Sequence, residues 1–374
     1  MTDSLLLPEG ARLLHIGPHK TGSTAIQVAM FRARPELAAH GVYYPGRRRR
    51  RREASEQLFP SGQPHTPQGP LPHWDALSGE VAAAGSMRVC VSDELFGKAS
   101  DETAAKIVHD LGGADVHVIA VARRLDTYLP SQWQERVKSG LCESYDAWLR
   151  VVLGDDVRPY EHRNVWRSHD LQALVERWVQ HVGPDRVTLV IADESDRTQL
   201  PRLLEAMLGL PQGLLELDHN KSNPSVALAE VELIRAVNNA LFGLGWSRRD
   251  CMRWVRHVVR AAAAYRGDLT GGLRPPMPKW AYPRVQELSD LRVEAIAALP
   301  ISVMGDPEWL RAAPLGEEDF DASALQIPIE LAATVVARVV EAAHAAEAAG
   351  PKLPTKTNVV SSKPRRSAAR RKLC

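Results

Sequence analysis

A cluster of small polar and charged residues lies between an apolar stretch and the first helical pattern of the chain: His19, Lys20, Thr21, Gly22, Ser23 and Thr24. The largely apolar stretch Arg12–Ile16 predicts a buried parallel strand, and the apolar spacing within 23–33 predicts a helix. In such a strand-loop-helix unit, the free N–H groups of the loop and the positive end of the helix dipole point at one place. The stretch therefore predicts an anion site.

A nucleotide phosphate is the obvious anion, but the loop differs from the phosphate loop of ATPases. Gly17 and Gly22 have the G-x4-G spacing of that loop, yet Ser23 follows the second glycine where an ATPase has a lysine. The ATPase lysine reaches the outer phosphates, and the next Ser or Thr holds magnesium. Here the lysine lies inside the loop, at Lys20, and an ATP site is therefore disfavoured.

Two arginines follow a second predicted strand. Val116–Ala122 is apolar apart from one histidine and ends at Arg123 and Arg124, before a helix predicted from about residue 126 to residue 138. Ser131 lies eight positions after Arg123. A guanidinium suits phosphate because it can donate two parallel hydrogen bonds to it. A strand that simply reaches solvent would end in the same way.

Together these two segments resemble the sulfotransferases that use 3′-phosphoadenosine 5′-phosphosulfate (PAPS). In that family the 5′-phosphosulfate loop reads His or Pro, Lys, Ser or Thr, Gly, Ser or Thr, Thr, and residues 19–24 match it. The family also has an arginine at a strand end and a serine eight residues later, which hold the 3′-phosphate. The resemblance covers about residues 10–240, and residues 164–191 also look like a helix and strand of bacterial members. It implies that Arg123 and Ser131 bind the 3′-phosphate.

The resemblance also implies a reaction, the transfer of a sulfuryl group from PAPS to a hydroxyl or amine, which releases 3′-phosphoadenosine 5′-phosphate. Lys20 would stabilise the charge on the leaving oxygen. The rest of the loop would hold the 5′-phosphate through backbone N–H groups and hydroxyls: His19, Thr21, Gly22, Ser23 and Thr24. No metal is expected, since a sulfuryl group brings less negative charge than a γ-phosphoryl group.

Glu94 is the candidate general base. It follows the predicted strand Arg88–Ser92, and ligands of an open parallel sheet bind at the carboxyl ends of its strands. The family has a histidine or glutamate base near this edge, so Glu94 would take the proton of the acceptor. Helix capping by Asp93 and simple exposure of Glu94 are the alternatives.

Lys221 and Ser222 are further candidate cofactor contacts. They precede a predicted helix at the place where the family closes over the nucleotide with a late basic or polar loop. The glycine motif of that loop is missing here, and capping of the helix by Asn223 or Ser225 would account for the same residues.

Two segments are strongly basic. The six arginines Arg47–Arg52 lie in a predicted irregular loop over 41–72, which could attract an anionic acceptor or cofactor or could be merely solvated. Residues 351–374 hold eight Lys or Arg and no acid, and they predict a disordered tail. Since the chain carries +2, removing these eight charges leaves −6 for the rest. Binding of nucleic acid or an anionic membrane by the tail would be non-specific and salt-sensitive.

Composition limits the class of protein. Of the 374 residues 44% are hydrophobic and 25% are charged, as in globular proteins. No apolar run is long enough to span a membrane, and the first residues lack the pattern of a signal peptide. The cysteines Cys90, Cys142, Cys251 and Cys374 form no C-x2-C pair, which argues against a zinc knuckle or a disulfide framework. We expect a cytoplasmic protein.

The whole pattern predicts an α/β sulfotransferase domain over 10–350. A mainly parallel five-stranded sheet, with strands at 12–16, 42–44, 88–92, 116–122 and 187–191, would lie between helices in a P-loop-like three-layer architecture. A helical extension would follow from about residue 225, and a loop over 155–169 would wall the acceptor pocket. The acceptor stays open among glycan, lipid, peptide tyrosine and small metabolite. The alternatives are a P-loop kinase or nucleotide hydrolase, and a polyanion- or nucleic-acid-binding protein that uses Arg47–Arg52 and the tail.

Overall fold

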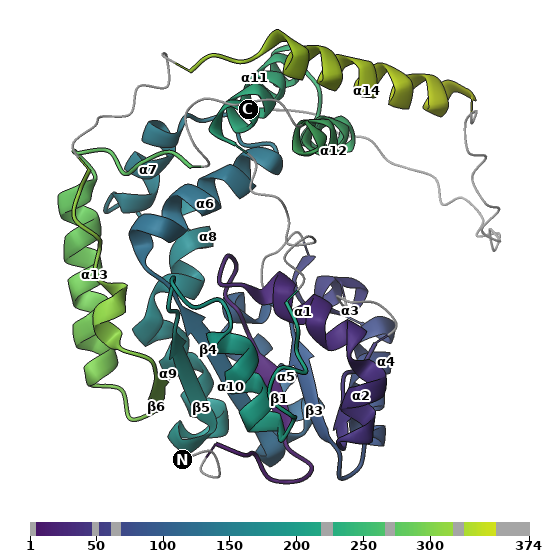
Figure 1. The fold of residues 1–374 in the computed structure, drawn as a ribbon, viewed down its shortest axis with the longest axis vertical. Helices are drawn as coiled ribbons and strands as arrows, with labels where there is room; N and C mark the ends of the chain where they lie inside the picture. Colours follow the sequence, from purple (N-terminus) through teal and green to yellow (C-terminus); the bar gives the residue numbers. More distant parts are fainter. Residues whose placement is uncertain are drawn as a thin grey trace, which may run out of the picture.

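A computed structural model describes residues 5–46, 52–60, 69–217, 227–265, 274–316 and 325–348. Its centre is a six-stranded sheet in which every pair of neighbours is parallel, in the order β2-β3-β1-β4-β5-β6 (Figure 1). The strands are β1 (Arg12–His15), β2 (Val42–Tyr43), β3 (Arg88–Ser92), β4 (Val116–Ala122), β5 (Val187–Ile191) and β6 (Ser302–Met304). The predicted α/β class and parallel sheet are confirmed.

Helices cover both faces of this sheet. The residues of β1 alternate between the faces, so that Leu13 packs on one side and Leu14 on the other. The Leu13 side is covered by α1 (Ser23–Arg32), α2 (Arg34–Ala39) and α10 (Gln199–Leu208). The Leu14 side is covered by α3 (Arg52–Leu58), α4 (Pro72–Ala83), α5 (Asp101–Leu111), α9 (Leu171–Val182) and α13 (Tyr282–Ala297). The predicted three-layer architecture is therefore also confirmed.

A second hydrophobic core lies beyond the sheet, among helices only. Its buried residues include Trp133, Trp148, Val231 and Val255. They come mainly from α6 (Leu125–Lys138), α7 (Tyr145–Leu153), α8 (Tyr160–His169), α11 (Leu228–Gly243), α12 (Arg248–Ala264) and α14 (Ile329–Ala348). Figure 1 shows α11, α12 and α14 at the end of the molecule beyond α6. Short 3-10 turns complete the described elements: η2 (Phe96–Lys98), η3 (Gly113–Asp115), η4 (Pro184–Arg186) and η5 (Pro307–Leu310).

Three details differ from the sequence prediction. The sheet has a sixth strand, β6, which is only three residues long and half-exposed, so that no apolar run marks it. Residues 155–169, predicted as a loop, contain α8, whose buried face includes the polar side chains of Asn164 and Ser168 and so lacks an apolar stripe. The segment 41–72, predicted as irregular, contains α3.

The strand order sets the place where a ligand would bind. β1 pairs with β3 on one side and with β4 on the other, and the chain visits the β3 side before it crosses to β4. The strand order therefore reverses at β1, and ligands of open α/β sheets bind in the crevice at the carboxyl ends of such strands. The β1–α1 loop, Glu94 and Arg123 all follow strands at this edge.

Several predicted features lie outside the described residues: Arg47–Arg51, Lys221, Ser222 and the tail 351–374. Arg52 is the first residue of α3. Within the described part of the chain, no helix has the length and apolar character that crossing a membrane requires.

Candidate functional site

The loop between β1 and α1 has an unusual backbone. Gly17 and Gly22 have φ values of 79° and 95°, and Lys20 has φ 67°. In the parts of the chain that the structure describes, Lys20 is the one non-glycine residue with a positive φ. A left-handed backbone conformation is strained for a residue other than glycine, so neighbouring groups must hold this loop in place.

The neighbours on both sides of β1 provide that support. On the β4 side, the N–H of Val121 donates to the carbonyl of Gly17 at 2.7 Å. On the β3 side, a Cβ added to Gly17 would lie 2.9 Å from the Cβ of Glu94, so only glycine fits. Within the loop, the hydroxyl of Thr21 donates to the carbonyl of Pro18 at 2.6 Å. The loop is thus fixed between two strand ends.

The N-terminus of α1 offers hydrogen-bond donors. Gly22 is the N-cap residue, and no side chain caps the helix. The hydroxyl of Ser23 is buried without a hydrogen-bond partner. Among the described residues, no protein acceptor receives a hydrogen bond from the backbone N–H groups of residues 20–24. Unpaired donors at a helix N-terminus are the groups that an anion requires, so the residues present fit a phosphate.

Lys20 is held at both ends by the β4–α6 unit. Nη1 of Arg123 donates to the carbonyl oxygen of Lys20 at 3.0 Å. Nζ of Lys20 donates to Oε2 of Glu135, on α6, at 2.8 Å. The structure therefore brings together Lys20 and Arg123, two residues that the sequence singled out in separate segments.

Arg123 has a carboxylate partner of its own. Its Nε and Nη2 donate to the two carboxylate oxygens of Glu194 at 2.5 and 2.9 Å. The hydroxyl of Thr127 donates to the same carboxylate at 2.7 Å. Neither Glu194 nor Glu135 was identified from the sequence. The i,i+4 spacing from Ser131 to Glu135 was the available signal, because it places both side chains on one face of a helix.

Ser131 is buried on α6, one turn before Glu135. Since Glu135 contacts Lys20, Ser131 lies on the face of α6 that is turned to the loop. Thr24 is half-buried in the first turn of α1. The predicted donor-binding residues that the structure describes thus come from two adjacent strand-helix units.

Glu94 is buried, with 7% of its surface exposed, so the alternative of simple exposure is wrong. Its Oε2 accepts a hydrogen bond from Gln27, on α1, at 2.9 Å. Its Oε1 lies 3.7 Å from Nδ1 of His19. Asp93 accepts a hydrogen bond from the N–H of Leu95 at 3.0 Å and so fixes the turn before η2. Glu94 therefore lies against the loop, within reach of His19.

A layer of buried polar groups surrounds Glu94. His15 shares a 2.8 Å hydrogen bond with the hydroxyl of Ser92, and burial lowers the pKa of His15 to about 4 although the charge of Glu94 acts in the opposite direction. Lys98, four residues after Glu94, donates to Oδ1 of Asn164 at 2.6 Å. Burial, together with the nearby charge of Arg136, lowers the pKa of Lys98 to about 8. Lys98 was not identified from the sequence, because its neighbours come from other elements.

Arg292 connects α13 to the same strand end. Its Nη1 donates to the carbonyl of Arg123 at 2.9 Å, while Nε and Nη2 are buried without hydrogen-bond partners. Burial lowers the pKa of Arg292 to about 10. His169 is buried nearby, with its ring stacked on Tyr128 at 3.6 Å between centroids.

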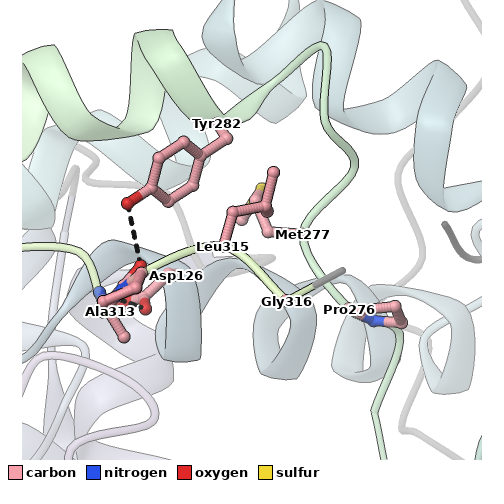
Figure 2. A pocket seen from close by; sticks show the side chains of 8 residues that line it. Asp126, Pro276, Met277, Tyr282, Ala313, Leu315 and Gly316 are labelled. Carbon is pink, nitrogen blue, oxygen red and sulfur yellow. Dashed lines mark hydrogen bonds between the residues drawn. The ribbon is translucent and has the colours of Figure 1, made fainter. Parts of the chain in front are cut away.

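A cavity of about 150 Å³ lies beside the first turn of α6 (Figure 2). Tyr282 donates to the carbonyl of Ala313 at 2.9 Å, and Asp126 accepts from the N–H of Ala313 at 3.1 Å and pairs with Arg124. The cavity is lined by Asp126, Pro276, Met277, Tyr282, Ala313, Pro314, Leu315 and Gly316. None of the candidate site residues lines it, so it is separate from the anion site.

Within the described ranges, no group of three or more His, Cys, Asp or Glu could hold a metal ion.

Comparison with known proteins gives one similar structure. No protein-family profile matches the chain, and no curated protein matches it. Among solved structures, a sulfotransferase from Alicyclobacillus acidocaldarius is 14% identical, with a TM-score of 0.38, and the match covers 66% of this chain and 96% of that one. A match at this level carries no argument about function, which must rest on the residues and contacts described above.

Proposed function

We propose that the chain is a sulfotransferase that moves the sulfuryl group of PAPS to a hydroxyl or amine of its acceptor. The observation that carries the proposal is the 3.0 Å hydrogen bond from Arg123 to the carbonyl of Lys20. It joins the two segments whose residue patterns are typical of PAPS binding, at the edge where the strand order reverses.

Donor binding would use both segments. Backbone N–H groups of Thr21, Gly22 and Ser23, with the hydroxyls of Ser23 and Thr24, would hold the 5′-phosphate, and the unpartnered Ser23 hydroxyl supports this role. Arg123 and Ser131 would hold the 3′-phosphate, since a guanidinium can donate two parallel hydrogen bonds to it. Lys221 and Ser222, outside the described residues, remain proposed contacts.

The chemistry requires charge stabilisation and a base. PAPS supplies the sulfuryl group when bound. Lys20 would stabilise the negative charge that develops on the leaving phosphate oxygen, because its ammonium group is held beside the loop. Glu94 would take the proton of the acceptor, since it lies against the loop, where the hydrogen bond from Gln27 fixes its carboxylate.

Conversion of PAPS to 3′-phosphoadenosine 5′-phosphate tests this proposal. The purified full chain would be incubated with PAPS and, in separate reactions, with neutral glycans, acidic glycans, phenols and amines. We expect faster formation of the nucleotide product with at least one acceptor class, together with sulfate on that acceptor. Equal rates with and without every acceptor, and no binding of PAPS, would overturn the proposal.

A further inference from the structure

Two carboxylates beside the loop have no role in the proposed function. Glu135 lies on α6, 2.8 Å from Nζ of Lys20, and Glu194 follows β5 and forms two hydrogen bonds to Arg123. Lys20 and Arg123 are the two cations proposed to face the 5′-phosphate and the 3′-phosphate. Each proposed phosphate-binding cation is thus already paired with an acid of the protein.

The geometry makes these acids compete with an incoming anion for the two cations. A lysine ammonium group presents three N–H donors, and Glu135 lies on one of them. The Nε and Nη2 groups of Arg123 could donate two parallel hydrogen bonds to a phosphate, but both already donate to the oxygens of Glu194. A phosphate that approached either cation would also approach a like charge.

Both acids have access to water. The side chain of Glu135 is 47% exposed and that of Glu194 is 30% exposed, so each can turn into water and be hydrated. A single-contact pair such as Lys20–Glu135 contributes little to stability, whereas the two parallel hydrogen bonds of the Arg123–Glu194 pair must be replaced by those that a phosphate accepts from Arg123. The pKa of each acid supports the pairing. Burial raises the pKa of Glu135, but the charges of Lys20 and Lys138 bring it below its ordinary value. Burial also raises the pKa of Glu194, but the hydrogen bond and the charge of Arg123 bring it below its ordinary value.

We propose that Glu135 and Glu194 are counter-ions that neutralise Lys20 and Arg123 before a nucleotide binds and that the phosphates of the nucleotide displace them one for one. Glu135 gives way to the 5′-phosphate and Glu194 to the 3′-phosphate. This inference rests on the proposed function, because it takes the two phosphates of the donor as the anions. It adds that each acid lowers affinity for one phosphate and leaves the other unaffected.

Nucleotides that carry only one of the two phosphates separate the roles. Adenosine 3′,5′-bisphosphate, adenosine 5′-monophosphate and adenosine 3′-monophosphate would be titrated calorimetrically into the wild-type chain, Glu135→Gln and Glu194→Gln. Glutamine keeps the shape of the side chain and removes its charge. Glu341→Gln is the matched control, since Glu341 pairs with Arg338 at 2.8 Å on the exposed face of α14.

We expect Glu135→Gln to tighten binding of the 5′-monophosphate and the bisphosphate by about tenfold, from the loss of one like charge, and to leave the 3′-monophosphate unchanged. Glu194→Gln should tighten the 3′-monophosphate and the bisphosphate by about the same factor and leave the 5′-monophosphate unchanged. Glu341→Gln should change none of the three affinities.

Other results overturn the inference in distinguishable ways. Equal affinity of all four proteins for the bisphosphate would refute the counter-ion roles and leave the proposed function intact. Weaker binding in either variant would show that the acid orients its cation. An equal gain in affinity for all three nucleotides would show a general charge effect. Either result would contradict displacement. Absence of binding by all four proteins would refute both the inference and the proposed function.

Discussion

Lys20 is the residue whose side chain and backbone are both constrained by the site. Its φ of 67° is unusual for lysine, Arg123 holds its carbonyl, and Glu135 holds its ammonium group. Strained conformations of this kind persist where surrounding groups fix them, and they cluster at functional sites. The constraints on Lys20 agree with a charge placed for catalysis.

Replacing this lysine should affect turnover more than binding. In Lys20→Ala we expect sulfuryl transfer to fall by about 10²- to 10³-fold, the usual effect of losing one donor aimed at developing charge. Affinity for 3′-phosphoadenosine 5′-phosphate should fall by a smaller factor than turnover, because the loop N–H groups remain. Product formation and calorimetry would measure the two quantities. Unchanged turnover would rule out the assigned role of Lys20.

Glu94 gives a second prediction at this scale. Glu94→Gln keeps a hydrogen-bond partner for Gln27 but cannot accept a proton, so transfer should fall by about 10²-fold or more while PAPS affinity stays the same. Steady-state rates at saturating PAPS, beside calorimetry of donor binding, would measure this. A rate within a few-fold of the wild type would remove Glu94 as the base.

Sequence patterns could identify Lys20 and Arg123 because each lies in a local motif. Glu194 and Lys98 could not be found in this way, and helical spacing could place Glu135 on the face of Ser131 but could not give its partner, since partners are set by the fold. Lys20 and Glu135, for example, are 115 positions apart in the chain. The resemblance to a known family pointed to donor-binding residues but not to the acids that pair with them here.

Among the elements, the tightest contact of the site is between the β1–α1 loop and the end of β3. Gly17 has φ 79°, and a Cβ there would lie 2.9 Å from the Cβ of Glu94. Gly10 has a similar φ of 77° but open space around it. The two glycines therefore separate the cost of the backbone conformation from the cost of the contact.

Alanine at these two positions should have unequal effects on stability. We expect Gly10→Ala to lower the free energy of unfolding by about 1 kcal/mol, from the positive φ alone. Gly17→Ala should lower it by roughly 2 kcal/mol more, because the loop and Glu94 must move apart. Urea unfolding of both variants would measure the difference. Equal losses would show that the loop is not packed against Glu94 as described.

The pairing of β1 with β3 should make stability depend on pH. His15 is buried against Ser92, and its pKa is lowered from 6.5 to about 4 by burial. Between these values the unfolded chain binds the proton and the folded chain does not, so stability is lost as the pH falls through this window.

For His15 alone, this loss is about 2 kcal/mol between pH 7 and pH 5. Urea unfolding at the two pH values should therefore show a smaller loss in His15→Asn than in the wild type, by about that amount. The comparison with the variant removes the contribution of the other histidines. The same loss in both proteins would mean that His15 takes up its proton in the folded state.

Strands and helices were predictable from the sequence where one pattern, such as an apolar run, was clear. β3, β4 and β5 are mainly apolar, as strands buried on both faces require, and each appears at its predicted place. β6 and α8 lacked such a signal. β6 is a short, half-exposed edge strand, and α8 buries polar side chains next to the site. α8, a helix that the sequence patterns missed, thus has a buried residue next to the site, since Asn164 accepts a hydrogen bond from Lys98.

For the whole molecule, the sheet and the helical core meet at the candidate site. α6 begins two residues after Arg123, packs in the helical core through Trp133, and carries Ser131 and Glu135 toward the loop. Arg292 of α13 also donates to the carbonyl of Arg123. The order of strands and helices, and hence this meeting of the two cores, was beyond a prediction from local patterns, because it depends on contacts between distant segments.

The central claim is that the carboxyl edge of the sheet binds a nucleotide with a 3′-phosphate. Its most direct test is the thermal shift of the purified chain with 3′-phosphoadenosine 5′-phosphate, beside ADP and ATP with magnesium, in the wild type and in Arg123→Ala. A ligand that binds only the folded state raises the melting temperature. We predict stabilisation by the 3′-phosphorylated nucleotide alone, lost in the variant. Stabilisation only by ATP with magnesium, or by none of the three, would contradict the account.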